Sequence, residues 1–504
     1  MFLGIDLGTT YSVGAYLDDK GNPNVVTNME GSQTTPSVVY FEGPNSVVVG
    51  QTAKDNSIIN PGDVVSAVKN YMGEKKVFRS SHGQEYSPEA ISGFILKKIV
   101  SDAGKRLDLK EKIKDVVVTI PAYFSDAQRM ATEDAVKIAG LNLLGMINEP
   151  TAAALYCAVE TKLNHANILV YDLGGGTFDV TIIRLDDEEV VVQSTGGLSK
   201  VGGRFFDMEL VEYVRDYVQE KYDIDLEDEE YSDAYQELFE RVEKAKWQLG
   251  NQEKATVAVR AGSVRENIVI TREAFESIVA KLYRRTEYVV KKAMKDAGLE
   301  AGDLDKVLLV GGSSKIPYIE QQLERLLGQA PSHEVHPDLV VAQGAALYGK
   351  QLTAKKQGVE NEGKIIRDVC SHSIGIVTID PVTYKKINSI QIKRNTQLPT
   401  EVRMPFRTAV DLQEHVELSI TEGEFAELTD VAIISSTDIV LPKNLAKGTK
   451  GEVYLQLDDS QLVHVFVKIP SANYEKEFTF ERSANLSEDE VNLLTGIIAE
   501  YNVN

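Results

Sequence analysis

The sequence is organised around one stretch, Tyr171-Asp-Leu-Gly-Gly-Gly-Thr-Phe-Asp179. Apolar residues flank it as Ala166–Val170 before and Val180–Ile183 after, and both runs are typical of buried strands. The glycines are expected to turn the first strand back onto the second. They also expose backbone N–H groups that no Cβ shields, so phosphate oxygens can approach them.

The same design opens the chain, as Gly4-Ile-Asp-Leu-Gly-Thr-Thr-Tyr-Ser12. Asp6 takes the place of Asp172, and the two Asp-Leu-Gly units lie 172 − 6 = 166 residues apart. Each unit is therefore expected to head one of two similar domains, with the phosphate chain of a nucleotide clamped between them. Asp172 and Asp179 bracket the glycines, where carboxylates can hold a metal ion and orient water.

Length and composition indicate a globular protein of about three domains, with 504 residues, 43% of them hydrophobic and 26% charged. The net charge, 54 − 76 = −22, argues against nucleic acid or an anionic membrane as the main partner, because phosphate groups require clustered Lys and Arg. No apolar run reaches transmembrane length, and Asp6 follows Met1 too closely for a signal peptide. The only cysteines, Cys157 and Cys370, suggest a reducing compartment. The sequence therefore predicts a cytoplasmic protein.

Strands alternate with helices in the first part of the chain. Val116–Ile120 and Lys306–Val310 are predicted strands, and Asp126–Ala139 is a predicted helix. Thr151–Val159 is a second predicted helix, with Pro150 in its first turn. This alternation predicts mixed α/β layers.

The pattern changes near residue 355, where a polar, glycine-bearing linker begins. Period-two alternation follows, for example at Val463, Val465 and Val467, and predicts an all-β sandwich. Beyond the sandwich, Ser487 and Glu490 form a capping box that begins a helix of about three turns. The predicted units are an ATPase-like α/β domain at 1–355, the linker at 356–370, the sandwich at 371–482 and a short terminal helix at 483–504.

The single tryptophan has an unusual position. A helix after the acidic run 223–230 has its apolar stripe at Leu238, Val242 and Leu249, and Trp247 lies off that stripe. It shares a face with Glu243. Either a neighbouring subdomain covers Trp247, or the exposed indole has a function.

Some alternatives are disfavoured by missing motifs. The chain has no Gly-x-x-x-x-Gly-Lys-Ser/Thr for a P-loop, and no Gly-x-Gly-x-x-Gly opens a helix after a first strand as in a dinucleotide-binding Rossmann domain. His333 and His336 lie in a loop without cysteine, which does not indicate zinc. Further glycine turns at Gly196-Gly197, Gly202-Gly203 and Gly311-Gly312 strengthen the prediction of a phosphate site.

Phosphoryl transfer requires electrostatic clamping and a positioned nucleophile. Candidates for holding magnesium through water are Asp6, Asp172 and Asp179; for contacting phosphates, Thr9, Thr10 and Thr177; and for positioning the attacking water, Lys69 and Glu149. From spacing alone Lys69 and Glu149 are unremarkable, since both residue types are common on surfaces.

Five segments in order resemble the heat-shock protein 70 chaperone family. They are Gly4–Ser12, Ile120–Phe124, Ile147–Ala154, Asp172–Asp179 and Val310–Pro317. The resemblance runs from Gly4 to about Val491 and is most specific over the first 350 residues. It implies an α/β actin-like ATPase domain of two similar lobes, followed by an all-β sandwich and a short C-terminal helix.

The resemblance also implies a hydrolytic centre and an ATP site. The hydrolytic residues would be Asp6, Lys69, Glu149, Asp172 and Thr177. Those around the phosphates would be Gly8, Thr9, Thr10, Tyr11, Gly174, Gly175, Gly176, Gly202 and Gly203. Those around adenosine would be Glu243, Lys246, Trp247, Gly311, Gly312, Ser313, Lys315 and Asp338. The implied cofactors are ATP or ADP, Mg²⁺ and, as an additional cation, K⁺.

Trp247 stands where this family usually has Arg or an apolar residue lying on adenine. An indole there could stack on the base, worth about 1–3 kcal/mol by analogy with base–aromatic stacking. Lys315 stands where Arg is usual and Gly250 where Ser is usual, so the adenine contacts are altered.

The second half resembles the family less closely. Asp368–Ile376 resembles the entry to the peptide-binding sandwich, but the linker Lys364-Ile-Ile-Arg-Asp368 has charges where the family has leucines. Pro405, next to Phe406, aligns with a central peptide-pocket position where Val is usual. The family's helical lid should begin near Ser487 and is missing, which predicts fast and weak peptide exchange.

Pro121, Arg129 and Asp368 match the family's relay between nucleotide state and domain docking. From the residues alone, Pro121 only ends a strand and Arg129 is a surface helix residue. Gly145 replaces an Arg that helps engage J-domain co-chaperones, although Asn148 and Asp368 are kept.

The leading hypothesis is an ATP-dependent chaperone of the stress-response and protein-folding type, whose sandwich binds unfolded or apolar peptide segments. A J-domain co-chaperone and a nucleotide-exchange factor are the expected partners. The alternative is an ATP-binding interaction protein whose sandwich recognises a dedicated partner, as Pro405, the missing lid and Gly145 suggest. A sugar or carboxylate kinase shares the fold, but the appended sandwich disfavours it.

Overall fold

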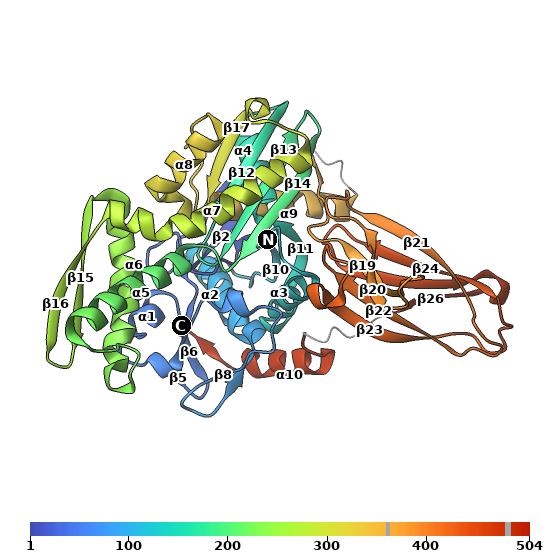
Figure 1. Ribbon diagram of the computed structural model, residues 1–504, viewed down its shortest axis with the longest axis horizontal. Helices are drawn as coiled ribbons and strands as arrows, with labels where there is room; N and C mark the ends of the chain where they lie inside the picture. Colours follow the sequence, from blue (N-terminus) through green and yellow to red (C-terminus); the bar gives the residue numbers. More distant parts are fainter. Residues whose placement is uncertain (359–362, 479–484) are drawn as a thin grey trace.

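A computed structural model describes residues 1–358, 363–478 and 485–504 of the chain. A mixed α/β body carries an all-β unit at one side (Figure 1). The body has two lobes, each built on its own sheet, which we call lobe I and lobe II. Among the residues described, no helix is long and apolar enough to span a membrane.

Lobe I is built on a six-stranded sheet with strand order β11-β10-β1-β2-β3, in which β4 also pairs with β2. β1 lies parallel to β10 and antiparallel to β2. The strands are β1 (Phe2–Asp6), β2 (Tyr11–Leu17), β3 (Pro23–Val25), β4 (Thr35–Pro36), β10 (Asp115–Ile120) and β11 (Asn142–Asn148). The helices that pack on this sheet are α2 (Pro88–Arg106), α3 (Asp126–Ile138) and α9 (Val340–Gln357).

Lobe II is built on a five-stranded sheet with strand order β17-β12-β13-β14-β18. The strands are β12 (Ala166–Leu173), β13 (Thr177–Leu185), β14 (Glu189–Ser199), β17 (Lys306–Val310) and β18 (Ile365–Arg367). The helices of this lobe are α4 (Glu149–Glu160), α5 (Gly203–Tyr222), α7 (Arg272–Ala297) and α8 (Pro317–Leu327). β12 lies antiparallel to β13 and parallel to β17, which repeats the pairing of β1 with β2 and β10.

Helices α4 and α9 pack against each other between the two sheets. Gly344 of α9 lies so close to the backbone of Ala152 in α4 that a Cβ would collide with it. This close approach explains the small residues of Ala342–Ala346, because larger side chains would force the helices apart. The lobes are therefore joined by a tightly packed pair of helices.

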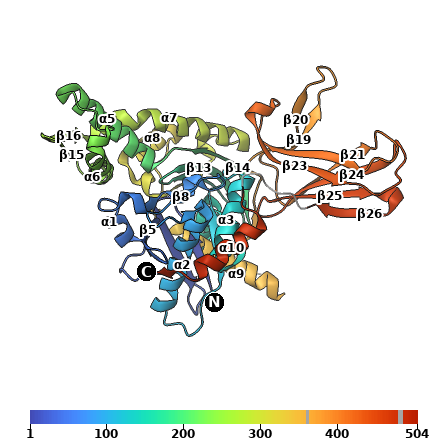
Figure 2. The same cartoon turned by 90° about the horizontal axis from the view of Figure 1, so that it is seen from below.

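Each lobe carries a smaller outer unit, or tip, and the two tips lie side by side (Figures 1 and 2). The tip of lobe I contains α1 (Gln51–Asp55), β5 (Val38–Gly43), β6 (Ser46–Val49), β7 (Val64–Ser66), β8 (Phe78–Arg79) and β9 (Glu85–Tyr86). The tip of lobe II contains α6 (Ser232–Asn251) and the hairpin of β15 (Lys254–Ala261) and β16 (Val264–Thr271), next to α5.

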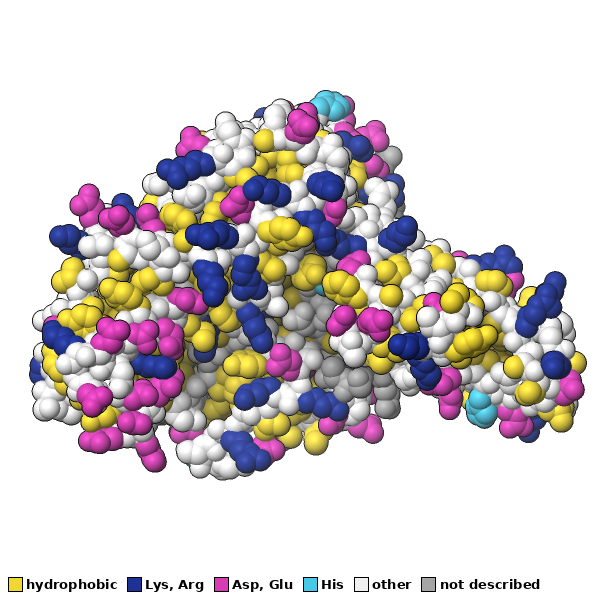
Figure 3. Space-filling model, in the orientation of Figure 1, with side chains coloured by type: hydrophobic (Ala, Val, Ile, Leu, Met, Phe, Trp, Pro, Cys, Tyr) yellow, Lys and Arg dark blue, Asp and Glu magenta, His cyan; other side chains and the backbone are white. Residues whose placement is uncertain are grey.

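Helix α6 has the predicted apolar stripe, since Leu238, Val242 and Leu249 are buried in the core of lobe II. Trp247 lies off this stripe and is 46% exposed, so the alternative that a neighbouring subdomain covers it is wrong. Acidic side chains gather over this tip (Figure 3), and Glu227–Glu230 of the acidic run are exposed.

The all-β unit consists of two antiparallel four-stranded sheets that share one core. Their strand orders are β20-β19-β22-β23 and β21-β24-β25-β26. The strands are β19 (Ile374–Ile379), β20 (Lys386–Ile392), β21 (Thr400–Arg407), β22 (His415–Glu422), β23 (Ala432–Val440), β24 (Lys450–Leu457), β25 (Val463–Ile469) and β26 (Tyr474–Phe478). Val463, Val465 and Val467 alternate with half-buried residues, as their spacing predicts. We call this unit the sandwich.

Parts of the predicted linker are not a free connection, because they belong to a helix and a strand of the body. Helix α9 continues to Gln357, and residues 359–362 lie outside the described part of the chain. Ile365–Arg367 forms β18, which adds parallel to the edge of β14. Ile366 packs against an apolar cluster of the body, so a two-residue apolar core is enough to seat the segment as a strand.

The terminal helix does not stand free of the body. α10 (Glu488–Ala499) begins at Ser487 with the predicted capping box, which Glu490 completes. It then packs on α2 and α3 of lobe I (Figure 2). A two-residue strand that the sequence did not reveal, β27 (Asn502–Val503), follows it and pairs with β6.

Candidate nucleotide site

A cavity of about 560 Å³ lies between the lobes, beneath the two tips. The predicted residues that line it are Asp6, Gly8, Thr9, Thr10, Tyr11, Lys69, Glu149, Asp172, Gly174, Gly175, Thr177, Gly203, Glu243, Lys246, Trp247, Gly311, Gly312, Ser313, Lys315 and Asp338. Gly176, Gly202 and Asp179 do not line it directly. Lining residues that sequence reasoning missed include Ser32, Thr34, Gln51, Arg204 and Asn251.

Two glycine turns form opposite walls of this cavity. The β1–β2 turn carries Thr10, and the β12–β13 turn carries Gly175, where a Cβ would collide with the Thr10 side chain. Gly202 has a φ of 147°, a conformation open to glycine, and its neighbour Gly203 donates its N–H to the carbonyl of Gly174 at 3.0 Å. The turns therefore approach closely because they lack side chains, and this leaves a cradle of backbone groups.

One buried ion pair lies at the inner end of the cavity. Lys69 Nζ lies 2.6 Å from Glu149 Oε1, and both side chains are less than a tenth exposed. Glu149 is the first residue of α4, whereas Lys69 belongs to a single 3₁₀ turn that begins after Ala67, whose φ is 52°. Burial opposes the charge of Lys69, but the attraction of Glu149 and Asp6 outweighs it and raises the pKa of Lys69.

Three aspartates surround this pair. Burial, reinforced by repulsion from Glu149, raises the pKa of both Asp6 and Asp179 to about 7. The same causes raise the pKa of Asp172 well above its ordinary value. Asp172 and Asp179 are direct partners in the β12–β13 register, which explains why the motif carries both.

This charge distribution fits a divalent cation. Four carboxylates share one lysine, and a bound cation would balance the negative charge that burial otherwise disfavours. In the described part of the chain no three acidic, histidine or cysteine side chains converge closely enough to enclose a metal. Carboxylates beside a cradle for phosphates suit Mg²⁺, which keeps several waters and binds substrate phosphates. Metal binding by Asp6, Asp172 and Asp179 stays a prediction.

Helix α6 supplies the outer wall, with Glu243, Lys246 and Trp247. Lys246 Nζ donates to the carbonyl of Gly203 at 2.9 Å and to Asp207 Oδ2 at 2.7 Å. Burial raises the pKa of Asp207 to about 6, against the attraction of Lys246. Sequence reasoning missed Asp207, although its place one helical turn after Gly203 was a usable signal.

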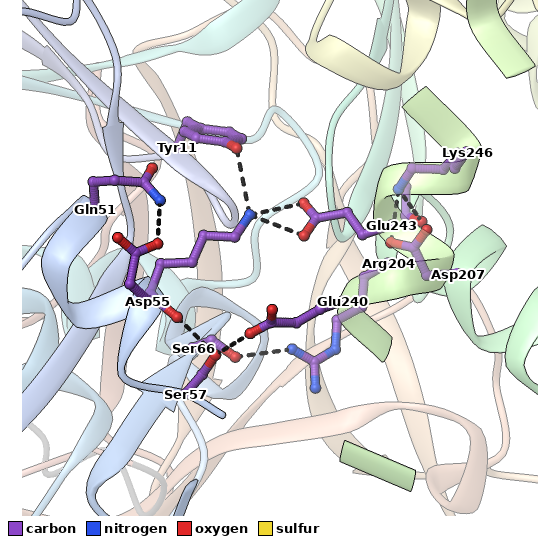
Figure 4. Close-up of polar contacts among 12 residues, drawn as sticks. Tyr11, Gln51, Asp55, Ser57, Ser66, Arg204, Asp207, Glu240, Glu243 and Lys246 are labelled. Atoms are coloured by element: carbon purple, nitrogen blue, oxygen red, sulfur yellow. Dashed lines mark hydrogen bonds and ion pairs between the residues drawn. The ribbon is translucent and has the colours of Figure 1, made fainter. Parts of the chain in front are cut away.

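The tips are tied together above the cavity (Figure 4). Lys54 Nζ of α1 donates to both carboxylate oxygens of Glu243, at 2.9 and 3.0 Å. Ser57 donates to Glu240 at 2.5 Å, so two residues of each tip take part. Sequence reasoning missed Lys54, because its partner lies 189 residues away.

The residues predicted to form a relay lie where the body meets the sandwich. Arg129 is 2% exposed, which rules out the alternative that it is only a surface helix residue, while its role in a relay stays a prediction. Its guanidinium donates to the carbonyls of Ala122 and Phe124 at 3.1 and 3.2 Å, and to Ser371 Oγ at 3.4 Å. Pro121 begins this turn directly after β10.

Two residues extend the contact from the cavity into the sandwich. Tyr123 donates its backbone N–H to Asp179 at 2.9 Å, and its carbonyl accepts from His372 Nε2 at 3.0 Å. Burial lowers the pKa of His372 to about 4, so at neutral pH the ring is an uncharged donor. Asp368 accepts from Asn148 Nδ2 at 2.9 Å. The Asp179 carboxylate and the sandwich are thus linked through one backbone unit.

The two residues predicted for peptide binding lie on opposite faces of β21. Phe406 packs towards the sandwich core, over Gly451, whereas Pro405 is exposed. Successive side chains of a strand alternate between faces, so the pair does not line one pocket. Peptide binding at Pro405 and Phe406 stays a prediction.

The chain was also compared with known protein families. Residues 2–502 match the family model described as "Hsp70 protein". The match covers both lobes, the sandwich and α10.

Proposed function

We propose, since the chain belongs to the Hsp70 family, that it is an ATP-dependent molecular chaperone with an actin-like ATPase body. In this proposal, ATP binding and hydrolysis between the lobes control how the sandwich holds unfolded or apolar polypeptide segments. The observation that carries the proposal is the convergence of both Asp-Leu-Gly turns and the Lys69–Glu149 pair on one cavity. Neither turn alone would indicate a nucleotide site.

The residues divide the chemical work by position. Thr10 and the N–H groups of the glycine turns would bind the phosphate oxygens, while Trp247 and Lys246 would hold adenosine. Lys69, held in place by Glu149, would orient the attacking water towards the terminal phosphate. Asp6, Asp172 and Asp179 would hold Mg²⁺ through water, and the ion supplies charge neutralisation at the phosphates.

The nucleotide signal would leave the cavity through Tyr123 and Arg129. Tyr123 joins Asp179 to His372, and Arg129 holds the Ala122–Phe124 turn against Ser371. A shift of Asp179 around bound nucleotide would therefore move the surface on which the sandwich rests.

The co-chaperone surface is altered at Gly145. A Cβ there would lie 2.7 Å from Leu352 Cδ1, so a larger residue would have to displace that side chain. Asn148 is buried and donates to Asp368, so neither residue replaces the missing Arg as an exposed contact, and we expect J-domain binding at this surface to be weakened.

The proposal is tested by ATP turnover of Asp172→Asn. The variant removes one carboxylate charge next to the phosphates, and we expect turnover to fall about 100-fold or more. Asp19→Asn is the matched control, because Asp19 is exposed in the turn after β2. Undiminished turnover of Asp172→Asn would contradict the assignment of the site.

A second candidate function is supported by the exposed position of Pro405 on the edge strand β21. In it the protein binds ATP, and the sandwich recognises one dedicated partner. Trp247 fluorescence separates the two functions while ATP and then an extended apolar peptide are added. If the peptide speeds turnover and ATP speeds its release, the chaperone proposal holds; a response to ATP alone favours the dedicated partner.

A further inference from the structure

The C-terminal residues form a second connection between the sandwich and the body. We call residues 485–504 the strap. α10 begins three residues after its start, and an apolar stripe at Val491, Leu494, Ile498 and Tyr501 faces lobe I. Ile498 is only 1% exposed, as a residue of a hydrophobic core is. A side chain that merely rests on a surface would stay more exposed.

Tyr501 is built into the aromatic core of lobe I. Its hydroxyl lies 2.9 Å from that of Tyr86, and its ring centroid lies 5.2 Å from that of Phe94. Phe94 and Tyr86 are themselves buried in lobe I. Removing the strap would expose this cluster to water, and the exposure of apolar surface to water is unfavourable.

Polar contacts fix the strap at both of its ends. Asn485 Nδ2 donates to the carbonyl of Ala127 in α3 at 2.8 Å. Lys97 Nζ of α2 donates to the carbonyls of Ile498 and Tyr501 at 2.8 and 2.9 Å, at the C-terminal end of α10, where a positive charge is favourable. The strap therefore docks in one register.

The last residues complete a sheet of lobe I. β27 pairs in parallel with β6, and Val49 donates its N–H to the carbonyl of Asn504 at 3.0 Å. With β27 in place the strand order is β27-β6-β5-β7, so β6 is an inner strand. Without it β6 would be an exposed edge, which proteins generally cover.

The strap limits how far the sandwich can travel. Phe478, the last described residue of β26, and Asn485, the first of the strap, are 485 − 478 = 7 Cα-to-Cα steps apart along the chain. Seven fully extended steps span at most about 25 Å. At its other end the sandwich is joined to lobe II through β18.

We infer that the outer face of lobe I is a docking site for the chain's own C-terminal strap, which stays seated through the nucleotide cycle and keeps the sandwich within reach of lobe I. The sandwich is then tethered to both lobes, and its movement is a local release from the Ala122–Asp126 surface. The nucleotide cycle itself rests on the proposed function, whereas the seating of the strap does not.

The test compares the full chain with strap variants. Ile498→Asp places a charge in the core of lobe I and unseats the strap. Lys97→Met is the milder second variant, since it removes only the contacts to the two carbonyls. Leu493→Asp is the matched control, because Leu493 lies on the same helix and is 64% exposed.

Two measurements are made on each protein, with no nucleotide, ATP or ADP. Hydrogen exchange of the Asn502 and Asn504 amides reports seating of the strap. Pulsed electron–electron double resonance measures the distance between spin labels at Lys110→Cys in lobe I and Lys443→Cys in the sandwich, and so reports how far the sandwich moves. Both sites are exposed, and the native cysteines are buried. ATP turnover, measured separately, tests the proposed function alone.

In the unaltered chain and in Leu493→Asp we expect the two amides to stay protected with every nucleotide, and the label distances to form one narrow population. Ile498→Asp and Lys97→Met should exchange at least tenfold faster at these amides and add a longer, broader distance population with ADP. The inference is overturned if the unaltered chain loses this protection with ADP, or if its distances match those of both variants. It is also overturned if protection depends on protein concentration, because the strap would then be exchanged between copies.

Discussion

The nucleotide cavity and the sandwich are held together by opposite kinds of chemistry. The cavity gathers Asp6, Asp172, Glu149 and Lys69 in a buried space, where burial, followed by repulsion from Glu149, raises the pKa of both aspartates. The sandwich core consists of aliphatic side chains such as those of Leu455 and Val467, which are fully buried. The residue types of the cavity are restricted by the charges that its chemistry requires. Those of the sandwich core are restricted only by side-chain volume and by the alternation of buried and exposed positions.

This difference has a functional consequence at the boundary between the two regions. The buried polar groups of the sandwich include Ser371 and Ser373, which lie on the side that meets the body. Because the core beyond them is largely aliphatic, we expect a nucleotide signal to enter the sandwich at this boundary. Variants that remove single contacts there, or inside the cavity, test the comparison.

The largest effect is expected for Arg129→Met, which breaks the contact between the two regions. It leaves the Phe124 carbonyl without this buried donor and the Ala122 carbonyl with Ser371 alone, and losing a buried partner costs about 1–3 kcal/mol. Because the bonds to Asn148 and Ser371 are lost as well, docking of the sandwich should weaken by about 200-fold or more, while basal ATP turnover stays within about threefold because no residue that lines the cavity changes.

Hydrogen exchange of the Asp126 amide, which donates to Glu422 of the sandwich, measures docking for this variant. Arg184→Met is the control, since that side chain is half exposed on lobe II. If Arg129→Met loses turnover as completely as Asp172→Asn, the cavity and the sandwich act as one functional unit, and the distinction drawn between the two regions is wrong.

A smaller effect is expected for Trp247→Ala, which alters the cavity alone. Loss of stacking on adenine, worth about 1–3 kcal/mol, should weaken ADP binding by about 5- to 150-fold. Trp247→Phe should recover part of the affinity, because a smaller ring still offers a stacking face. Calorimetric titration with ADP measures both variants, and equal affinities for all three proteins would show that the indole does not touch the base.

The same contrast explains what could be predicted from the sequence. The Asp-Leu-Gly turns carry local signals, so the strands around Asp6 and Asp172 are where the motif predicted them. The alternation of Val463, Val465 and Val467 likewise predicted strand β25. In both cases the information lies within a few residues of the feature that it describes.

What could not be predicted depends on pairs of distant residues. Arg129 has the sequence context of a surface helix, and only the sandwich, more than 240 residues later, buries it. β27 has two residues, too few for any periodicity, and is a strand only because β6 offers an edge. The position of α10 on lobe I was equally hidden, since its apolar stripe does not say which surface will cover it.

The smallest effect is expected for Lys54→Met, which opens the cavity at the tips without changing its chemistry. Lys54 and Glu243 are one-fifth to one-quarter exposed, and the pKa of Lys54 is raised because the attraction of Glu243 and Tyr11 outweighs burial. An ion pair of this partly exposed kind contributes about 1 kcal/mol or less, so ADP should leave up to about fivefold faster while turnover with saturating ATP is unchanged. Release is followed by stopped-flow fluorescence of Trp247, with Lys20→Met, an exposed turn residue, as the control.

The salt dependence of release sharpens this result, because screening weakens the ion pair. Raising the salt concentration should speed ADP release from the unaltered protein and have less effect on Lys54→Met. Equal salt dependence in the two proteins would mean that the tips are held by other contacts, such as that of Ser57 with Glu240.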